Sequence, residues 1–586
     1  MRLIMSLVLA GLTAASLQAA PTAEFAELIA EFEALELNAD PVRAGRRGDL
    51  EAASRWPDQS PSALSARREA NAELFQRLKA IDSDALPEDD QISYQVLDHV
   101  LGSRVALAEY GPERMPFTND SGFFSLPIQV ASATRPSSVA EAEAWIERMR
   151  ALPEYFRNEQ NWLKQGVEDQ FVQPEIVVRR VMEQVRELAE TAPDNHPMMA
   201  PLNHLPGHIA ASKKQQLLDA ALETMNQAVL PAYKDLLTFL EQVYLTAPRT
   251  SIGISALPGG RDYYRALVRH HTTLDTTPEA VHQQGLAEVE RIRTEMEAVI
   301  EDSGFEGSFA QFLDYLRNDP KFYADSEREL LMHAAWIAKR ADDAMPRFFR
   351  HLPRLPYGVR PVPEAMAPNY TTGRYWAGDL DNGLAGGYMV NTYRLEQRPL
   401  YELPALTLHE AVPGHHHQIA LAQELEDVPE FRRQTYITAF GEGWALYTEW
   451  LGVEMGIYET PYEHFGRLTY EMWRACRLVV DTGMHYFDWS REQAEACLLE
   501  NSALAPHNVR TEIERYISWP GQALAYKTGE ILIRALRSQA EETLGEAFDL
   551  REFHDHILAV GALPLNVLEK RMHDWIAGHS DADRLD

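Results

Sequence analysis

The sequence is poor in cysteine and in positive charge, and both shortages exclude classes of protein. Cys476 and Cys497 are the only cysteines among 586 residues, which excludes a disulfide-rich scaffold and a cysteine-based metal motif. Either one bridge between them or two buried free thiols fits this pair. Lysine and arginine number 55 against 88 acidic residues, a net charge of −33, and no basic patch interrupts this surplus. We therefore expect no nucleic-acid partner, because a polyphosphate would be repelled.

Long hydrophobic runs are the third shortage. Beyond the first 20 residues, no segment offers 18 uncharged apolar residues, so no integral membrane segment is expected in the mature chain. Residues 1–20 differ, because Arg2 precedes a short apolar run that ends in small residues. This pattern is typical of a secretory signal peptide cleaved near Ala19 or Ala20, and no cysteine follows that could carry a lipid. We expect an exported protein, periplasmic or secreted; an uncleaved N-terminal anchor is the alternative.

What the sequence does contain is helical periodicity. Apolar residues make up 45% of the chain and charged residues 24%, values that are typical of globular proteins and exclude disorder. In one segment Thr277 and Pro278 supply a helix cap and a first-turn proline, and apolar residues recur at three- and four-residue spacing until Gly304. Strand-like stretches are few and short, the best being residues 387–393. The sequence predicts an all-α protein, mainly helical, with a few short strands near the active site.

The helical pattern continues without a long linker or a fixed repeat. Proline-rich stretches occur near residues 193–206 and 351–368, but neither is a flexible Gly/Ser linker. We therefore predict a single large helical domain over residues 21–586. The stretch at residues 353–363 is a candidate crossing between two lobes of that domain.

The most informative stretch is HEAVPGHHHQ at residues 409–418. In zinc peptidases with an HExxH motif, two histidines four residues apart lie on one helix face, and the glutamate between them acts as a base on the metal-bound water. Here the histidines after His409 come six, seven and eight residues later. On a straight helix the sixth residue points about 240° away and the seventh lies about 10.5 Å along the axis, so neither could share a metal ion with His409.

Pro413 and Gly414 resolve this conflict of spacing. Proline removes a backbone donor and glycine tolerates a left-handed backbone, so a local loop is expected here. If the loop extrudes two residues, His415 returns to the place of an ordinary fourth-residue histidine; if it extrudes three, His416 does. The sequence predicts His409 and His415 as metal ligands, with His416 as the alternative second ligand.

The third ligand is expected in EGWALYTE, at residues 442–449. Glu442 and Glu449 are seven residues apart and share one helix face, where unpaired buried carboxylates would be costly. We interpret Glu442 as the third metal ligand, and Glu449 as a residue that holds a ligand histidine or the substrate from behind. The aromatic residues of this stretch are interpreted as ordinary core. A His/His/Glu set favours zinc, and we expect one Zn2+ per chain.

These motifs carry a resemblance to a known family. HEAxPGHHxQ, EGWALYxE, RLVxDTGxH and RYxxxPGQALAYKxG stand in this order at residues 409–418, 442–449, 477–485 and 515–529. On them the chain resembles the bacterial family of domain of unknown function 885 (DUF885), roughly over residues 25–575. The resemblance implies a zinc-metallopeptidase-like, mostly helical protein. It also implies a layout similar to thimet-oligopeptidase-like enzymes, in which two helical lobes flank a deep channel.

The chemistry that these residues allow is metal-assisted amide hydrolysis. Glu410 would accept the proton of a water whose pKa the zinc ion lowers to about 7. A donor to the oxyanion is also needed, and Tyr526 stands in a position resembling the tyrosine that helical zinc peptidases use. Tyr516 and His485 are the alternatives for this role. Lys527 is either a ligand for a substrate carboxylate or a solvated side chain.

Substrate contacts are expected from the short strand upstream of the metal motif. Tyr388 and Asn391 lie in the stretch where zinc peptidases often keep an edge strand that pairs with an extended peptide. A simple hairpin is the alternative interpretation of this stretch.

The first hypothesis is an exported zinc-dependent hydrolase that cleaves peptide bonds of short peptides with metal-activated water and a glutamate base. The short length follows from the channel that the family resemblance implies. One alternative is a zinc-dependent hydrolase of a small non-peptide amide. The other is a non-catalytic periplasmic binding protein, in which Glu410→Gln would change nothing measurable. The physiological substrate, the endo- or exopeptidase mode and the oligomeric state stay open at this point.

Overall fold

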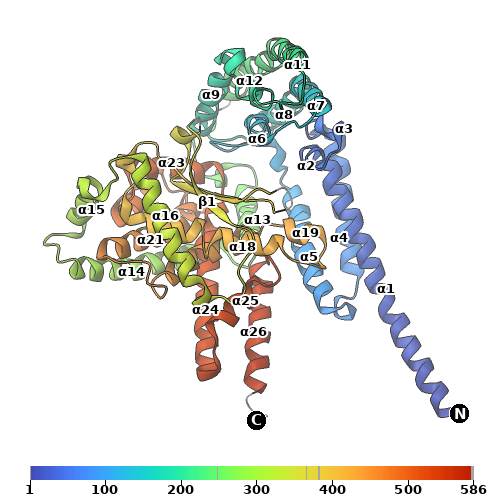
Figure 1. Cartoon of the computed structure of the whole chain (residues 1–586), viewed down its shortest axis with the longest axis vertical. Coiled ribbons are helices and arrows are strands. Elements are labelled where there is room, and N and C mark those ends of the chain that lie inside the picture. The colour runs from blue at the N-terminus through green and yellow to red at the C-terminus, as the bar shows by residue number, and fades with distance from the viewer. Residues whose placement is uncertain (1, 247, 365, 381–382, 583–586) are drawn as a thin grey trace. The chain divides into compact units, whose positions relative to one another are not determined.

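The fold is built almost entirely from helices, as the sequence predicts (Figure 1). The computed structural model describes residues 2–246, 248–364, 366–380 and 383–582. Within these ranges the strands form one three-stranded sheet, and no helix combines the length and apolar character that a membrane crossing requires. The side chains of residues 1–20, where a signal peptide is predicted, lie outside the described part.

The contacts divide the chain into two compact units. Unit 1 comprises Met1–Tyr263 and Ile517–Trp519, and unit 2 comprises Tyr264–Tyr516 and Pro520–Asp586. The proline-rich stretch at residues 353–363, expected as a crossing between lobes, lies inside unit 2, where it contains a strand of the sheet. The channel expected between two lobes stays a prediction.

Unit 1 is helical. Within it α4 packs on α5, α7 on α11, and α9 on α12. Its helices are α1 (Arg2–Ala39), α2 (Pro41–Arg46), α3 (Leu50–Ala53), α4 (Pro61–Ala80), α5 (Glu88–Ala108), α6 (Leu126–Ala133), α7 (Val139–Arg150), α8 (Leu152–Glu168), α9 (Glu175–Glu190), α10 (Ala200–Asn203), α11 (Ala211–Thr224) and α12 (Leu230–Gln242).

Unit 2 holds the sheet and the motifs named above, apart from residues 517–519 of the last motif, which belong to unit 1. Its helices are α13 (Gly260–Thr272), α14 (Pro278–Asp302), α15 (Phe309–Asn318), α16 (Glu327–Phe348), α17 (Leu403–Glu410), α18 (His415–Gln423), α19 (Glu430–Gln434), α20 (Thr438–Leu451), α21 (Pro461–Tyr486), α22 (Arg491–Asn501), α23 (Pro506–Ser518), α24 (Ala525–Leu544), α25 (Leu550–Leu558) and α26 (Leu565–Ala582). A boundary between the units falls within α13 and another within α23. Its strands are β1 (Tyr357–Pro361), β2 (Gly373–Trp376) and β3 (Gly386–Val390).

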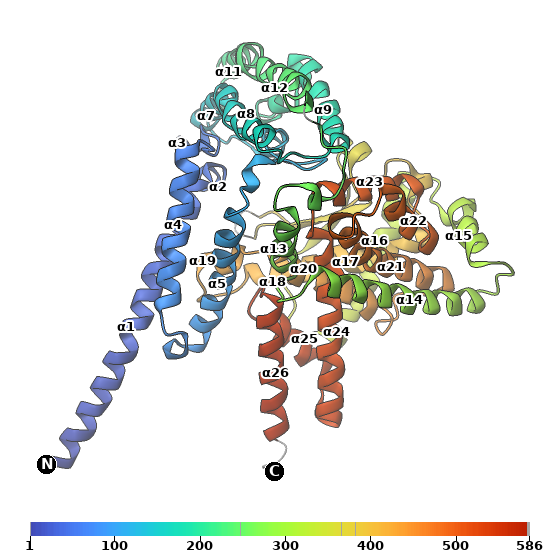
Figure 2. The ribbon, with the colours of Figure 1, turned by 180° about the vertical axis from the view of Figure 1, so that it is seen from behind.

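Helix α14 shows how the local sequence sets such bounds. The side chain of Thr277 accepts a hydrogen bond from the backbone N–H of Ala280. The helix starts with Pro278, which lacks a backbone N–H, and an N–H at this first position would have no partner within the helix. The helix stops ahead of Gly304, whose φ of +69° lies in the left-handed region. Its apolar stripe, with Ile292 and Met296 fully buried, packs along α21 (Figure 2).

The core of unit 2 is centred on α21. Every residue over 465–486 is buried, so the charged side chains of this helix need partners inside the protein. Glu471 accepts a hydrogen bond from the Lys527 ammonium at 2.8 Å. The same ammonium pairs with Glu288 at 3.0 Å and with Glu530 at 2.6 Å, so ion pairs join α14, α21 and α24. This corrects both interpretations of Lys527, because its ammonium is fully buried and held by three carboxylates.

The strand predicted at residues 387–393 exists as β3, but its place in the sheet differs from the expectation. The strand order is β1-β3-β2, with β3 parallel to β1 and antiparallel to β2. Tyr388 lies opposite Val359 on one side and Tyr375 on the other. Because β3 is hydrogen-bonded on both sides, it is not the expected edge strand and cannot pair with an extended peptide.

The two cysteines are neighbours in space without a bond between them. Cys476 on α21 is buried and Cys497 on α22 is half-buried, and both are free thiols. Their Sγ atoms lie 2.9 Å apart. Of the two arrangements that fit the sequence, the structure contains the unbridged one.

Candidate metal centre

The predicted interruption of the helix lies between Glu410 and His415. α17 ends at Glu410 and α18 begins at His415, so residues 411–414 form a loop. A Cβ atom on Gly414 would lie 2.0 Å from the carbonyl oxygen of His409, and no side chain fits at that distance. The glycine therefore allows the chain to turn back so tightly that a new helix starts beside the end of the old one.

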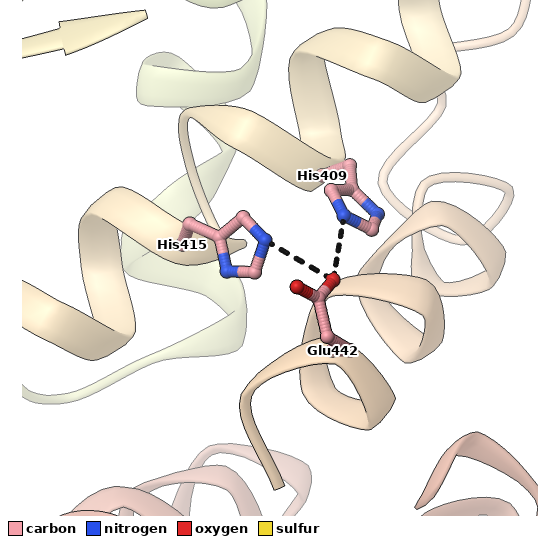
Figure 3. A group of neighbouring side chains, drawn as sticks. All are labelled: His409, His415 and Glu442. Carbon is pink, nitrogen blue, oxygen red and sulfur yellow. Dashed lines mark ion pairs between the residues drawn. The ribbon is translucent and has the colours of Figure 1, made fainter. Parts of the chain in front are cut away.

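This loop brings two histidines and one glutamate together. His409 and His415 both direct Nε2 at the Oε2 atom of Glu442, at 3.3 and 3.4 Å (Figure 3). One ligand atom from each of the three side chains lies within 4.8 Å of the other two. His409 comes from the end of α17, His415 from the start of α18 and Glu442 from α20. The structure thus places together the three residues that the sequence predicts as ligands.

Glu449 lies behind His409, on the side away from Glu442. Its Oε1 atom is 2.7 Å from His409 Nδ1, and the residue is only 1% exposed. Burial by itself lowers the pKa of His409, but the hydrogen bonds to Glu442 and Glu449 outweigh it and raise the pKa to about 9. Two carboxylates around one imidazole attract a positive charge, which can be a proton or a metal ion.

The other two histidines of the motif point elsewhere. His416 Nδ1 lies 3.0 Å from the hydroxyl of Tyr375, and its ring packs against Tyr357 of β1. Burial lowers the pKa of His416 to about 4, so it is neutral. His417 is fully buried against Phe349, and burial lowers its pKa to about 3. Of the two candidates for the second ligand, His415 therefore faces Glu442, and His416 faces the sheet.

Glu410 is held by the edge of the sheet. The backbone N–H of Tyr375 donates to Glu410 Oε2 at 2.7 Å, and Glu410 is 7% exposed. Since β2 is an edge strand, this N–H lies outside the ladder and is available to a side chain. The hydroxyl of Tyr436 donates to Glu442 Oε1 at 3.4 Å. The sheet thus orients a carboxylate next to the predicted ligand His409.

A protein-family profile matches nearly the whole sequence. The profile of the family described as "Bacterial protein of unknown function (DUF885)" matches residues 41–572. The chain belongs to the DUF885 family. No curated protein matches the sequence of this DUF885 chain significantly.

Two solved structures resemble this DUF885 chain over most of its length. A candidate lipoprotein from Colwellia psychrerythraea is 28% identical, with a TM-score of 0.86 over 95% of this chain and 99% of that one. A candidate lipoprotein of unknown function from Shewanella oneidensis is 17% identical, with a TM-score of 0.69 over 94% of this chain and 99% of that one. The second likeness shows a shared fold alone.

Tyr526 of the DUF885 chain lies in a group of cationic and aromatic side chains. The guanidinium of Arg477 stands 4.2 Å from the centre of the Tyr526 ring. Against the lowering effect of burial, nearby acidic groups that include Tyr526 and Glu410 raise the pKa of Arg374. Arg374 is the β2 neighbour of Tyr375, and among the described residues its guanidinium has no ion pair. Arg374 therefore lies within electrostatic range of both Tyr526 and Glu410.

Two of the predicted site residues, Tyr516 and His485, are hydrogen-bonded inside the core. The Tyr516 hydroxyl accepts hydrogen bonds from Trp473 Nε1 and Arg477 Nε, both at 2.7 Å, and His485 Nε2 lies 2.9 Å from the Tyr516 carbonyl oxygen. Both residues are buried. These contacts make them structural and not oxyanion donors.

The two expected substrate residues, Tyr388 in β3 and Asn391 just after it, are likewise hydrogen-bonded inside the protein. The Tyr388 hydroxyl lies 3.1 Å from Thr407 Oγ1, and its residue is fully buried. The Asn391 amide donates to three backbone carbonyls, and its oxygen accepts from the N–H of Tyr393. This corrects the expectation that both bind substrate, because their polar atoms face the protein.

Trp444 is hydrogen-bonded to the loop at residues 411–414. Its indole N–H donates to the carbonyl oxygen of Pro413 at 2.8 Å, and the residue is fully buried. One turn later on α20, the Thr448 hydroxyl donates to the carbonyl oxygen of Leu408 at 3.1 Å. The helix that supplies Glu442 thus also fixes both ends of the turn that positions His415. The sequence favoured a core role for this tryptophan, and only its hydrogen bond reveals the second role.

Trp444→Phe is expected to lower the free energy of unfolding by about 1–3 kcal/mol, because a buried carbonyl loses its donor. The affinity of the predicted site for zinc should also fall, by about tenfold, because the loop that positions the predicted ligand His415 is released. Denaturant unfolding measures the change in stability, and competition with a chelator measures the change in zinc affinity. Trp145→Phe is the matched control, because it also removes a buried indole donor from a carbonyl oxygen, that of Met198. Equal zinc affinities in the two variants would contradict the positioning role.

Asp481 is not paired with Arg477, which lies four residues earlier on α21. Its Oδ1 accepts from the Tyr264 hydroxyl at 2.6 Å and from the backbone N–H of Gly521 at 2.9 Å. Arg477 instead donates to Tyr516. Burial raises the pKa of Asp481 to about 7, although these hydrogen bonds oppose the rise.

This pKa predicts a pH-dependent stability difference between the wild type and Asp481→Asn. The folded protein keeps the Asp481 proton up to about pH 7, whereas the unfolded chain loses it near pH 4. The stabilisation from the protonated form is therefore complete below pH 4 and lost as the pH rises to about 7, by about 1.4 kcal/mol per pH unit. Denaturant unfolding of both proteins between about pH 5 and 8 checks this. A difference independent of pH would contradict it.

Proposed function

We propose that this protein is an exported zinc-dependent hydrolase that cleaves peptide bonds of short peptides. The observation that carries the proposal is the cluster of His409, His415 and Glu442, with one ligand atom of each within 4.8 Å of the others, next to the oriented carboxylate of Glu410. The description of both structural neighbours as candidate lipoproteins supports export, as does the N-terminal apolar run. The same two observations support a periplasmic or secreted location.

The side chains fit a zinc ion by their chemistry and by their spacing. Two imidazole nitrogens and one carboxylate oxygen are a common protein set for catalytic zinc. Ligand atoms about 2.0–2.1 Å from a tetrahedral ion lie about 3.3 Å from one another, and the two Nε2 atoms lie 3.3 and 3.4 Å from Glu442 Oε2. Glu449 behind His409 is the carboxylate that orients such a ligand and sets its tautomer.

The roles of the other residues follow from their contacts. A zinc ion held by this triad would lower the pKa of water to about 7 and polarise the scissile carbonyl. Glu410, with Oε2 held by the sheet, accepts the proton of the attacking water on Oε1 and passes it to the leaving nitrogen. Tyr526 donates to the carbonyl oxygen as negative charge develops on it. Arg374 supplies a positive charge beside them.

Metal content tests the proposal first. Protein purified without chelator or affinity nickel is expected to contain about one zinc per chain, and His409→Ala and Glu442→Ala are expected to contain none, because three protein ligands are required. His415→Gln and His416→Gln form the matched pair, since both replace a buried histidine of one motif. Zinc should be lost in the first and retained in the second.

Peptide-library and small-amide screens then separate the two enzyme hypotheses. Hydrolysis of peptides supports the first, and hydrolysis of small non-peptide amides alone would replace it. Well-folded wild type that neither contains zinc nor takes it up on titration would overturn both. The non-catalytic periplasmic binding protein would then be the better conclusion.

A further inference from the structure

Unit 1 contains a cavity that has no part in the proposed hydrolysis. Its volume is about 380 Å³, which is within the range of small-molecule sites. Its lining includes aromatic side chains and two carboxylates. The lining residues relevant to ligand binding are Gln59, Glu113, Phe123, Tyr155, Glu159 and Trp162.

Glu159 is the unusual residue of this cavity. It lines the cavity and yet is only 4% exposed. Tyr155 lies one turn before it on α8 and hydrogen-bonds to it, and Trp162 lies almost one turn after it, so three lining residues share one helix face. No described residue forms an ion pair with Glu159. The nearby cation is Arg67. Its guanidinium donates hydrogen bonds to the carbonyl oxygen of Asp58, at 2.8 Å, and to the side-chain oxygen of Gln59.

A buried carboxyl group without a cation is costly, and a glutamine or a leucine would be cheaper at this position. Burial raises the pKa of Glu159 to about 8, against the opposing effects of Arg67 and of the hydrogen bond with Tyr155, so its carboxyl group is mainly protonated at neutral pH. The other lining carboxylate, Glu113, is already paired with Arg68. Glu159 is therefore the one lining carboxyl whose positive partner is missing among the described residues.

The walls next to Glu159 are aromatic. Tyr155 and Phe123 are buried, at 5% and 4% exposure, and Trp162 is half-buried with its indole N–H donated to the carbonyl oxygen of Gln59 at 2.8 Å. That bond fixes the indole ring in place. Aromatic faces attract cations, and they also cover the apolar stem of a ligand.

We propose that this cavity binds a small organic cation, with an ammonium group paired to Glu159 and an apolar stem against Tyr155 and Trp162. The ligand class is a primary amine about the size of an amino-acid side chain. The proposal is independent of the metal centre, since every residue in it belongs to unit 1.

Calorimetric titration of the full-length protein tests this, with two amines and their neutral counterparts as probes. Butylamine and phenethylamine are compared with butan-1-ol and 2-phenylethanol at about neutral pH. The wild type is expected to bind at least one amine about tenfold more tightly than its alcohol. Glu159→Gln should bring that ratio close to one, while Glu113→Gln, which alters a carboxylate already paired, should leave it nearly unchanged.

Other results would overturn the proposal. Equal binding of amine and alcohol to the wild type, or a preference that survives in Glu159→Gln, would show that Glu159 does not hold the ammonium. Absence of saturable binding of any probe up to about 10 mM would identify the cavity as a water-filled space. Should Glu159→Gln fail to fold, Glu159→Asp keeps the carboxyl group one methylene further back and should reduce the preference without abolishing it.

Discussion

Replacing Glu410 with glutamine is expected to reduce the rate of hydrolysis by about 10²–10⁴-fold while leaving about one zinc ion per chain. The glutamine keeps the size of the side chain and can still accept the hydrogen bond from the Tyr375 N–H. It cannot take a proton from water, however, and so the base is lost without disturbing the ligands. Steady-state kinetics on the best substrate from the peptide screen, together with metal analysis by mass spectrometry, measure both effects.

The matched control for Glu410→Gln is Glu402→Gln. Glu402 is buried to the same degree, at 6% against 7% exposure, and lies just before the start of α17. Burial raises its pKa to about 8, so it is uncharged at neutral pH and glutamine is a close substitute. We expect unchanged rates in this variant. Retained turnover in Glu410→Gln would remove Glu410 from the mechanism and, with zinc present, would leave the metal site as a structural one.

Gly414→Ala is the second substitution with a large expected effect. The new Cβ atom would lie 2.0 Å from the carbonyl oxygen of His409 and 2.4 Å from that of Leu408. Both are backbone atoms of α17, so they cannot move aside without disturbing the helix end that carries His409. We expect the free energy of unfolding to fall by about 3 kcal/mol or more, because overpacking at backbone has no cheap relaxation. Zinc should be absent after dialysis.

Gly578→Ala provides the control for this substitution. Gly578 is exposed on α26, and nothing lies within 4 Å of the position that its Cβ would occupy. Alanine there should leave zinc content unchanged and should stabilise the helix by up to about 1 kcal/mol. Denaturant unfolding and metal analysis of the two variants side by side make the comparison. Full zinc content in Gly414→Ala would show that the tight loop is not what positions His415.

Much of the fold could be predicted because it depends on local sequence. The cap at Thr277, the first-turn proline and the stop before Gly304 act within a few residues of the helix ends they define, and α14 has the expected bounds. The strand at residues 387–393 was likewise visible from its β-branched and aromatic residues. Its place in the middle of the sheet was not, because strand order is set by β1 and β2, which pair with it from other parts of the chain.

The candidate site, like the fold, could be predicted from the sequence only in part. Motif spacing was enough to select His409 and Glu442, and Pro413 with Gly414 predicted that the helix would break. The choice between His415 and His416 required the number of residues in the loop, which follows from how closely Gly414 approaches the backbone of α17. A short motif shows which ligand atoms are present, but it does not show how far the chain turns between them.

By itself, the sequence determined the helical class, the absence of a nucleic-acid-binding charge pattern and the residue types for a metal centre. These depend on composition and on periodicity, which are properties of the chain before it folds. Only the tertiary structure decided which polar residues are free for chemistry. Lys527 and Tyr516 stand in a later motif than Glu410, and Asn391 lies upstream of the Glu410 motif; partners elsewhere in the fold use the polar atoms of all three. Burial makes such partners obligatory, and only packing of the whole chain supplies them.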